Sequence, residues 1–571
     1  MRRTSRFTLV VALLASSLSL AGPSAQATSG DLDTTFSDDG FTSVDFNALF
    51  DDARAIAIQP DGKVIIGGKV TPFSGSQFGL ARLTTSGDLD TTFSGDGKKS
   101  GTLGGTYNDL YDIALQSDGK IVAVGAKYFS NLNDAVWLIA RYTADGDLDT
   151  TFSGDGIQTL DFSPYSGERA QAVAIQSDGK IVVGGQFKDG SNPSFALARF
   201  TSSGELDMTF SADGIQTQDF NNGQDGIYDL AIQDDGKIVA AGLAQIAGDW
   251  DVGIARYTPN GNLDTTFSDD GVLTSDFGSF EKANSVALQP DGKIVVLGET
   301  VPSGSTESNL LVARYSSTGV LDTSFSGDGK FVSDLGGDNV YGMSMVIQPD
   351  GKIVGVGSSQ VTTTPTTTRC FVARLTESGE LDTTFSTDGI VVASPLAKDN
   401  ERCSTVAMQS DGALLAAGTS YTNTPEADFV VMRILNAVGP SALSYTPSTV
   451  SLPINVAVSP LIPTVTGTVT SWSVSPALPT GLTLDPSTGV ISGTPTTATA
   501  SATYTITATN GAGTDTYDIT IEVFGPPTAV TYTSNSLSLA ANQAMTALTP
   551  TVTGTVTSWS VSPALPTGLT L

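Results

Sequence analysis

Two short phrases recur seven times along this chain at matched spacing, and this repetition is the strongest constraint on its fold. The first phrase resembles "AIQSDGKIVVGG", and its Asp recurs every 56 to 61 residues, at Asp61, Asp118, Asp178, Asp235, Asp291, Asp350 and Asp411. The second phrase resembles "LDTTF" and ends at Phe36, Phe93, Phe152, Phe210, Phe267, Phe325 and Phe385. A fixed period of this kind indicates a repeat architecture in which each unit packs against its neighbours.

One period contains four short runs that favour β-strands. Within residues 156–214 these are "GIQTLDF", "AQAVAIQ", "KIVVGGQF" and "FALARFT", each bounded by turn-forming residues. The turn "SDG" joins the second and third runs, as expected for a hairpin in which Gly adopts a positive φ. Four strands without helical periodicity predict one blade, so seven periods predict a seven-bladed β-propeller. A β-solenoid is the alternative, but its coils are usually shorter, and a closed ring hides strand edges.

Three residues recur once per period, and each has a structural interpretation. A glycine five residues into the third run is expected where backbones approach closely: Gly68, Gly125, Gly185, Gly242, Gly298, Gly357 and Gly418. An arginine in the fourth run is expected to bridge to the Asp of "LD": Arg82, Arg141, Arg199, Arg256, Arg314, Arg374 and Arg433. The Phe of "LDTTF" is expected to plug the space between blades, and "SGDG" to lead into the innermost strand of the next blade. A ligand-binding function of the seven arginines is the alternative.

The paired phrases resemble the delta-60 repeat of bacteria, whose tandem units carry "LDxxFxxDG" and "QxDGKI" as this sequence does. The resemblance covers residues 30–436. It implies a propeller-like array that is secreted or exposed at the cell surface. It implies no activity and no set of functional residues.

The first residues predict export. Arg2, Arg3 and Arg6 precede the apolar run "FTLVVALLASSLSLAG", and small residues follow at "AQA", so residues 1–27 are interpreted as a signal peptide. The apolar run is shorter than the roughly 20 residues of a membrane span, which predicts no membrane insertion after cleavage. An N-terminal anchor that is never cleaved is the alternative. The expected location is extracellular, either released or at the cell surface.

The charge and the missing histidine narrow the possible functions. The chain has 28 Lys and Arg against 59 Asp and Glu, a net charge of −31, and no His. Nucleic acid and anionic lipid would repel such a chain. Without His there is no Ser-His or Cys-His nucleophile and no imidazole metal ligand. We therefore predict a protein that is not an enzyme and has no nucleic-acid partner.

The loops of the propeller differ in how much they vary. The "SDG" hairpins and "LDTTFSGDG" connections, expected on one face, are nearly constant, whereas the loops expected on the other face differ in every period. Recognition usually resides in variable loops on a rigid scaffold, although neutral drift produces the same pattern. On this face, Tyr128, Phe129 and Trp250 are candidates for binding a glycan or protein; Trp250 is alternatively the beginning of a strand.

Calcium and a disulfide are two further possibilities. The acids of "DGDLD", Asp145–Asp149, and the "FSDDG" turns at Ser37 and Ser268 offer carboxylates, but the spacing of a calcium-binding loop is missing and Asp is common in such turns. Cys370 and Cys403 fall in the last two periods. They are expected either to form a disulfide near the closure of the ring, which an exported protein allows, or to remain two buried thiols.

The composition changes after Ile434, where Thr, Ser, Val and Pro replace the charged residues. We predict a propeller over 28–436, an immunoglobulin-like β-sandwich over 437–525 and an incomplete second one over 526–571. The segment "PTVTGTVTSWSVSPALPTGLTL" occurs at 463–484 and again, unchanged, at 550–571, so the second domain is expected to be truncated. The phrases "LPTGLTLDPSTGVISGTP" and "YTITATNGAGT" resemble immunoglobulin-like domains of bacterial surface proteins. That resemblance implies spacer or adhesive modules.

These observations predict an all-β chain that acts as a secreted or cell-surface binding or adhesion protein, with the propeller as a recognition head on an immunoglobulin-like stalk. A structural protein of the envelope or surface layer is one alternative. A secreted propeller enzyme acting on polysaccharide through paired carboxylates is another, although the acids mostly belong to the repeated motifs.

Overall fold

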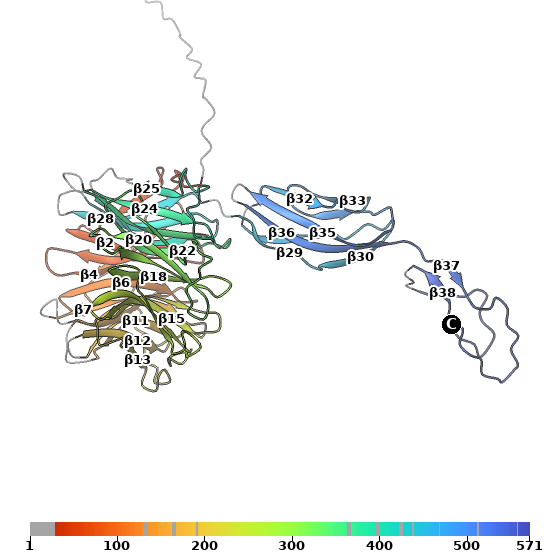
Figure 1. Cartoon of the computed structure of the whole chain (residues 1–571), viewed down its shortest axis with the longest axis horizontal. Helices are drawn as coiled ribbons and strands as arrows, with labels where there is room; N and C mark the ends of the chain where they lie inside the picture. The colour runs from red at the N-terminus through yellow and green to blue at the C-terminus, as the bar shows by residue number, and fades with distance from the viewer. Residues whose placement is uncertain are drawn as a thin grey trace, which may run out of the picture.

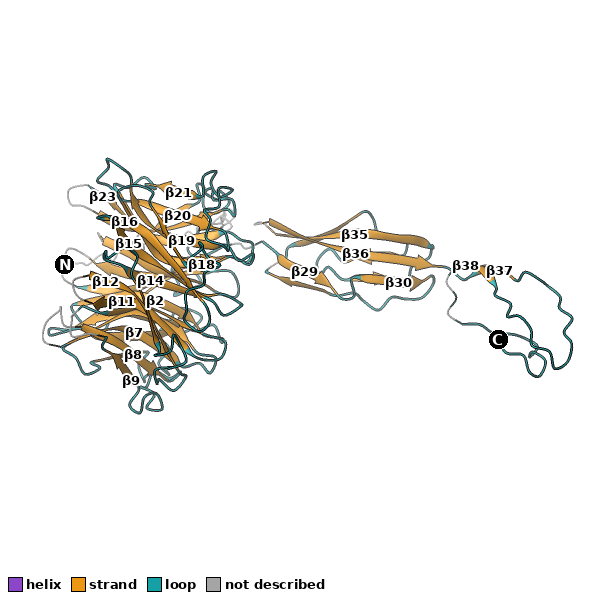
Figure 2. Cartoon of the chain, turned by 60° about the horizontal axis from the view of Figure 1, so that its bottom comes forward, coloured by secondary structure: helices purple, strands orange, loops and turns teal. Residues whose placement is uncertain are grey.

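The chain forms an all-β structure in two parts. The computed structural model describes residues 29–129, 135–162, 167–189, 192–362, 367–393, 400–421, 426–436, 439–467, 469–510, 513–554, 556 and 558–571. These residues contain strands, turns and loops and no helix (Figures 1 and 2). Within the same residues, no helix has the length and apolar character of a membrane span.

The first part is a ring of four-stranded sheets, consistent with the predicted seven blades. Blades one to three contain β2 (Phe50–Ile58), β3 (Val64–Thr71), β4 (Gln77–Leu83), β5 (Lys98–Gly101); β6 (Tyr107–Leu115), β7 (Ile121–Tyr128), β8 (Ala135–Tyr142), β9 (Ile157–Leu160); and β10 (Arg169–Ile175), β11 (Ile181–Asp189), β12 (Asn192–Phe200), β13 (Ile215–Gln218). Blades four and five contain β14 (Gly226–Ile232), β15 (Ile238–Ile246), β16 (Asp249–Tyr257), β17 (Val272–Ser275); and β18 (Phe280–Leu288), β19 (Ile294–Val301), β20 (Asn309–Tyr315), β21 (Lys330–Ser333). Blades six and seven contain β22 (Asn339–Ile347), β23 (Ile353–Val361), β24 (Thr367–Leu375), β25 (Ile390–Ala393); and β26 (Asn400–Met408), β27 (Leu414–Tyr421), β28 (Ala427–Ile434), β1 (Phe41–Val44).

The grouping of strands into blades differs from the sequence-based expectation. "GIQTLDF" was expected to begin a blade as its innermost strand, but β9 pairs antiparallel with β8 and is the outer strand of the preceding blade. The turn "SGDG" therefore leads outward within one blade and not to the next inner strand. The reason is that the connection 143–156 folds back along β8: Leu148 bridges to Tyr142, and the Arg141 N–H donates to the carbonyl oxygen of Gly156, so the next strand is placed beside β8.

The ring closes with a strand from the other end of the chain. β1 pairs antiparallel with β28 from Phe41↔Met432 to Val44↔Phe429 and completes blade seven. Leu32 forms a further bridge with Ile434. A disulfide between Cys370 in β24 and Cys403 in β26 also joins blades six and seven. Hydrogen bonds and one covalent bond thus hold the last two blades in the ring.

The recurring glycine lies opposite an irregularity in each inner strand. In blade three the register between β10 and β11 shifts between Ala170 and Ala172. A Cβ added to Gly185 would lie 1.9 Å from the carbonyl oxygen of Arg169, a distance no side chain tolerates. The same close approach recurs in the other six blades. The expected close backbone contact is therefore present, and it accommodates a β-bulge at the centre of the ring.

Apolar side chains fill the space between blades, as the recurring Phe led us to expect. The seven "LDTTF" phenylalanines are at most 1% exposed. Phe210 of blade three belongs to one core cluster with Leu197 of its own blade and with Ile238 and Tyr257 of blade four. Burial of each such ring contributes about 1.5–3 kcal/mol to folding.

The second part is a β-sandwich beginning after the propeller. Its sheets combine β30 (Thr449–Pro453), β36 (Gly513–Phe524), β35 (Thr499–Asn510) and β32 (Ser471–Ser475); β29 (Ser441–Tyr445) and β31 (Pro463–Thr466); and β33 (Leu482–Leu484) and β34 (Ile491–Gly493). Trp472, Ile506 and Ile519 belong to its single core cluster. After residue 525 the described residues form only the short pair β37 (Thr528–Thr531) and β38 (Thr551–Thr553).

Candidate functional site

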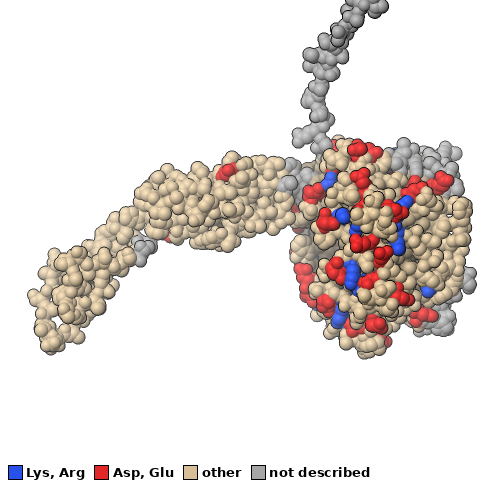
Figure 3. All heavy atoms as spheres, turned by 180° about the vertical axis from the view of Figure 1, so that it is seen from behind, with Lys and Arg blue, Asp and Glu red and all other residues tan. Residues whose placement is uncertain are grey.

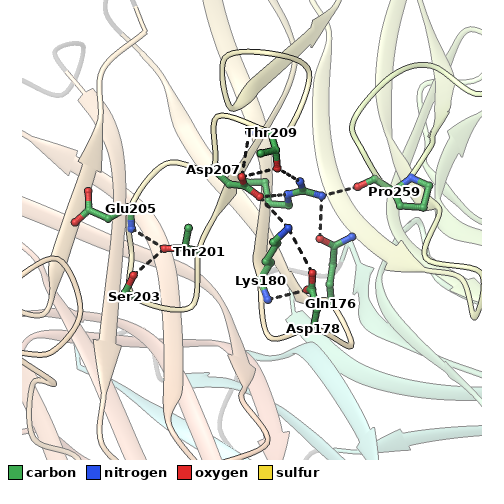
Figure 4. A network of polar contacts seen from close by, with 10 residues as sticks. Gln176, Asp178, Lys180, Thr201, Ser203, Glu205, Asp207, Thr209 and Pro259 are labelled. Carbon is green, nitrogen blue, oxygen red and sulfur yellow. Dashed lines mark hydrogen bonds and ion pairs between the residues drawn. The ribbon is translucent and has the colours of Figure 1, made fainter.

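The predicted arginine bridges are present in every blade, as one network in blade three illustrates (Figure 4). Arg199 Nε donates to Asp207 Oδ2 at 2.8 Å, and Nη2 donates to Thr209 Oγ1 at 3.1 Å. Nη1 donates to the carbonyl oxygen of Pro259, which follows the third strand of blade four. The guanidinium also lies 4.8 Å from the ring centroid of Phe210. Six of the seven arginines connect their own blade to the next one in this way, whereas the bonds of Arg433 go to Gln409, Asp33 and Asp411 of blade seven itself.

The lysine of the "DGK" phrase completes this network. Lys180 Nζ lies 3.2 Å from Asp207 Oδ2 and 3.5 Å from Asp178 Oδ2. Burial alone would raise the pKa of Asp207, but the hydrogen bonds from Thr209 and the ammonium of Lys180 lower it below its usual range. Equivalent Arg–Asp ion pairs occur at Asp90, Asp149, Asp264, Asp322, Asp382 and, across the ring closure, Asp33.

These contacts account for the acids that raised the possibility of calcium in the turns. In "DGDLD", Asp149 accepts bonds from Arg141 and Thr151, and Asp147 lies 3.7 Å from Lys99. In "FSDDG", Asp39 Oδ1 and Asp270 Oδ1 accept backbone N–H groups at Phe41 and Val272. Protein donors therefore engage Asp39, Asp147, Asp149 and Asp270 among these turn carboxylates, and the repeated arginine network is an assembly device between blades.

The three aromatic candidates lie in different surroundings. Tyr128 was expected in an exposed loop, but it ends β7, is 3% exposed and lies with its hydroxyl 3.4 Å from that of Tyr111. Phe129 is 43% exposed, and Lys127 Nζ lies 5.5 Å from its ring centroid. Trp250 lies within β16, half-buried, 6.4 Å from the ring of Phe280. No ring contact joins any two of these three side chains among the described residues, and residues 130–134 of the loop after Phe129 lie outside the described part.

A cavity of about 620 Å³ lies at the centre of the ring and was missed by the sequence reasoning. Its lining comes from the first halves of the inner strands and the last halves of the second strands. The ionisable and aromatic members are Asp52, Arg54, Tyr111, Asp112, Tyr228, Asp229, Lys282, Glu299, Tyr341 and Arg402. Those strand halves lie toward the loops that vary between periods. The cavity therefore belongs to the variable face of the propeller.

Opposite charges and tyrosine rings are combined in this cavity. Arg54 Nε donates to Asp52 Oδ2 at 2.9 Å, and its guanidinium lies 4.8 Å from the ring centroid of Tyr111. Lys282 Nζ lies 3.7 Å from the ring centroid of Tyr228. Burial lowers the pKa of Lys282, and the neighbouring Glu299 acts against that shift. Such a lining offers a polar ligand both hydrogen-bonding groups and aromatic faces.

Two carboxyl groups of the cavity, those of Asp112 and Asp229, are held by backbone groups of the next blade. Asp112 Oδ2 accepts Val173 N–H, and Asp229 Oδ2 accepts Val286 N–H, each at 2.8 Å. Burial, with a further contribution from the charge of Asp229, raises the pKa of Asp112 to about 8. Burial raises the pKa of Asp229 to about 6.

One position of the inner strand lines the cavity with a different residue in almost every blade, although the recurring glycine beside this strand is constant. The residue two positions after the one whose carbonyl faces the recurring glycine lines the cavity in all seven blades and is different in nearly every blade: Arg54, Tyr111, Gln171, Tyr228, Asn284, Met343 and Ser404. Periodic residues hold the blades together, whereas these residues differ and converge on the centre. The signal was present in the aligned periods, but it identifies a site only once the inner strand of each blade is known.

The charged residues are concentrated in the propeller. Figure 3 shows acidic and basic side chains intermingled on one of its faces, while the sandwich is almost free of them. From residue 437 onward the sequence contains only four ionisable side chains with a charge at neutral pH, Asp485, Asp515, Asp518 and Glu522, and no Lys or Arg.

Comparison with protein families matches both parts of the chain. The family described as "Domain of unknown function (DUF5122) beta-propeller" matches residues 59–93, 116–152, 176–210, 233–267, 289–325 and 348–385. The family described as "Putative Ig domain" matches residues 440–524. The chain contains DUF5122 propeller repeats followed by an Ig domain.

The number of DUF5122 matches follows from the ring closure. Each match runs from near the "DG" hairpin to the Phe of "LDTTF" in the same blade. In blade seven the hairpin follows Gln409, whereas the corresponding phenylalanine is Phe36 near the other end of the chain. No segment as short as one repeat contains both residues. The repeat of blade seven is therefore divided between the two ends of the propeller.

Comparison with solved structures returns distant similarities. Virginiamycin B lyase from Staphylococcus aureus, in a catalytically inactive form with quinupristin, shares 12% identity over 69% of this chain and 98% of its own, with a TM-score of 0.39. The polysaccharide lyase Uly1 shares 11% identity over 67% and 89%, with a TM-score of 0.39. Sqt1 from Chaetomium thermophilum shares 12% identity over 67% and 96%, with a TM-score of 0.32.

Comparison with curated protein sequences gives no match. A DUF5122 propeller joined to an Ig domain is an arrangement that points to a surface or binding protein.

Proposed function

We propose that this chain is an exported binding or adhesion protein whose propeller is a recognition head carried on an immunoglobulin-like stalk. The leader of residues 1–27 supports export, and the low charge of the sandwich supports a spacer. The observation that carries the proposal is the central cavity, because its lining differs from blade to blade while the contacts between blades repeat.

The chemistry of the cavity favours a polar extracellular ligand, and we propose a glycan. Tyr111, Tyr228 and Tyr341 supply ring faces, and Arg54, Lys282 and Arg402 supply donors beside the acids Asp52 and Glu299. Sugars present both hydroxyl groups and apolar C–H faces, which such a lining is able to contact. The lining has three bases, Arg54, Lys282 and Arg402, against the four acids Asp52, Asp112, Asp229 and Glu299, so it does not require a highly charged ligand.

A glycan and cell-envelope binding screen tests this proposal. The chain without its leader is expected to bind one glycan class saturably, and Tyr228→Ala and Arg402→Ala are each expected to weaken binding by about tenfold or more. Phe129→Ala changes an exposed ring outside the cavity lining and serves as the matched control. If Phe129→Ala or Trp250→Ala abolishes binding and the cavity variants do not, the loop rim is the site instead.

An absence of binding from a folded sample would favour the structural alternative, a component of the envelope or surface layer. Solid-phase association with purified envelope material, measured on the same sample, separates that alternative from a recognition head. A structural protein is expected to associate with the envelope regardless of the cavity variants.

One observation favours a second candidate, a polysaccharide-acting enzyme. Asp112 and Asp229 place two carboxyl groups in one cavity, and catalysis on glycosidic bonds uses such a pair, one protonated and one ionised. Burial raises the pKa of Asp112 to about 8, above that of Asp229 at about 6, so the two would differ in protonation between these values. Their bonds to Val173 and Val286 N–H groups support a structural function instead. Release of reducing ends that is abolished by Asp112→Asn and Asp229→Asn, with binding retained, would establish the enzyme.

A further inference from the structure

Three carboxylates converge at each of two places where an outer strand crosses to the next blade. Cluster one consists of Asp45, Asp51 and Asp428, and cluster two of Asp251, Asp276 and Glu281. In each cluster, one oxygen from every residue lies within 4.8 Å of the other two. Neither cluster belongs to the repeated arginine network or to the central cavity.

The two clusters occupy equivalent positions in different blades. Asp276 directly follows β17, whose last residue Ser275 pairs with Val252, the neighbour of Asp251 in β16. Glu281 lies near the beginning of β18, the inner strand of the next blade. Cluster one repeats this arrangement with residues after β1, in β28 and in β2. The arrangement therefore joins three strands from two blades.

Each cluster contains a buried carboxylate oxygen without a donor. Among the described residues, no hydrogen-bond partner reaches Asp251 Oδ1 or Asp51 Oδ1. Asp251 is 6% exposed and Asp51 is fully buried. Leaving a carboxylate oxygen buried and unpaired is costly, and proteins usually satisfy it with a donor or a cation.

The negative charge of cluster two is not balanced by an ion pair with Lys or Arg among the described residues. None of the ion pairs found within the described residues includes Asp251, Asp276 or Glu281, and the nearby Asp249 adds a further negative charge. Burial, followed by the charges of Asp276 and Asp249, raises the pKa of Asp251 to about 6. Lys330, which lies over the adjacent Phe277 ring, is paired with Asp328.

Cluster one has a base at its edge. Lys98 Nζ donates to the backbone carbonyl of Asp45 at 2.7 Å and lies 5.9 Å from the ring centroid of Phe46. Burial nevertheless raises the pKa of Asp51 to about 6, with further contributions from Asp45 and Asp428. Cluster two is therefore the stronger of the two candidate sites.

We propose that clusters one and two are calcium sites. Calcium–oxygen distances are about 2.3–2.6 Å, so two oxygens on one ion lie at most about 5 Å apart, and the separations in both clusters satisfy that limit. All ligands are hard carboxylate oxygens, without the His or Cys that zinc or copper prefers. Magnesium requires near-ideal octahedral geometry and retains its water, so three rigidly placed carboxylates suit calcium better.

Calcium bound in either cluster would link two neighbouring blades on the face that carries the variable loops. Asp276 begins the connection 276–279 between β17 and β18, and Asp45 begins the connection 45–49 between β1 and β2. A cation that bridges these connections to β16 and β28 would order the loops beside the central cavity. This inference is independent of the proposed glycan binding, since it concerns assembly of the face and not its ligand.

A third blade provides a natural control. Asp219 follows β13 and Asp225 precedes β14, so this crossing has two of the three carboxylates. The position equivalent to Asp251 is Ser194, which precedes the pair Phe195↔Gln218. Both oxygens of Asp225 accept backbone N–H groups, as the equivalent Glu281 accepts Phe277 N–H and the Thr300 hydroxyl. Unlike the two clusters, this crossing has no buried carboxylate oxygen without a donor among the described residues. We expect no calcium there in the native chain.

Calorimetric titration of the chelator-treated chain with calcium chloride tests the proposal. Two saturable sites are expected, with dissociation constants of about 10⁻⁴–10⁻³ M as in other extracellular modules. Asp251→Asn is expected to remove one site, Asp428→Asn the other, and the double variant both. Asp219→Asn, the matched control, is expected to retain two sites. No saturable binding, or two sites in the double variant, would overturn the proposal.

A gain of binding separates a calcium site from a folding defect. Ser194→Asp adds the third carboxylate to the two-acid crossing and is expected to create a third site. Thermal unfolding provides a second readout: calcium is expected to raise the melting temperature of the native chain and not that of the Asp251→Asn/Asp428→Asn variant. If Ser194→Asp folds and adds no site, the three-carboxylate arrangement is not what binds calcium.

Discussion

Residues 463–484 and 550–571 have the same sequence but different structures. In the first copy the segment contributes β31, β32 and β33, and Trp472 is 8% exposed. In the second copy only Thr551–Thr553 is assigned to a strand among the described residues, and Trp559 is 44% exposed. Local propensity is identical, so the difference arises from what surrounds each copy.

The first copy is surrounded by partners that lie outside it. β32 pairs with β35, and the ring of Trp472 lies against Gly489, where a Cβ would approach it to 2.6 Å. Ile506 and Ile519 complete the same core cluster. The second copy has only β37 as a strand partner among the described residues. A strand of this sequence becomes ordered structure only when another segment covers its apolar face.

Adding strand partners for the second copy should produce the largest change. A chain in which residues 485–524 are appended after Leu571 is expected to fold a second sandwich, because residues 526–549 already resemble 439–462. The indole N–H signal of Trp559, identified by its loss in Trp559→Phe, should shift toward that of Trp472 and become protected from hydrogen exchange. An unchanged signal would show that the shared segment is not the limiting part of the domain.

Removing the shared tryptophan should affect only one copy. Trp472→Ala is expected to destabilise the sandwich by about 3–5 kcal/mol, because it leaves a large cavity in the core. Hydrogen exchange of the β35–β36 amides would then accelerate by more than about 100-fold. Trp559→Ala is the matched control and should leave this exchange unchanged. Equal effects of the two variants would contradict the burial difference.

Crowding the Trp472 side chain from Gly489, which lies outside residues 463–484, should have an intermediate effect on the stability of the sandwich. Gly489 has a φ of +71° and lies against the Trp472 ring. Gly489→Ala is therefore expected to destabilise the sandwich by about 1–3 kcal/mol, measured by the same exchange experiment. Gly568 also has a positive φ, but nothing lies within 4 Å of its missing Cβ, so Gly568→Ala is the control.

The smallest effect concerns the turn that follows the first copy. Hydrogen bonds from Ser487 and Thr488 lower the pKa of Asp485. Its contribution to stability is therefore present above its unfolded pKa of about 3.8 and is lost as pH falls through the lower folded pKa. Calorimetry between about pH 6 and pH 3 should show a smaller loss of melting temperature in Asp485→Asn, with Trp472→Ala identifying the sandwich transition. An equal loss of melting temperature in the native chain and in Asp485→Asn would show that Asp485 does not contribute to the pH dependence of the sandwich's stability.

In the propeller, too, the features set by residues close in sequence were predictable, and those set by residues distant in sequence were not. The aligned periods predicted the four strands, the Arg–Asp bridges and the buried Phe, since each follows from residues close in sequence. The grouping of strands was wrong, because "GIQTLDF" is compatible with either side of the crossing. Only the pairing of β9 with β8 assigns it to a blade.

The candidate site was less predictable than the fold. The sequence directed attention to aromatic residues of variable loops, yet Tyr128 is buried against Tyr111 and supports the cavity from behind. The cavity is lined by Arg54, Lys282 and Arg402, which are far apart in the sequence and belong to blades one, five and seven. Their convergence requires closure of the ring, which no local pattern encodes.

The sequence by itself determined the repeat, the strand-forming runs and the residues that connect neighbouring blades, because periodicity and ion-pair chemistry act over short separations. Tertiary structure alone decided that β1 completes the seventh blade, that carboxylates from three strands meet at two crossings, and that one of two identical segments is folded into a core. The physical reason is that strand pairing, charge clustering and apolar burial depend on partners that are distant in sequence.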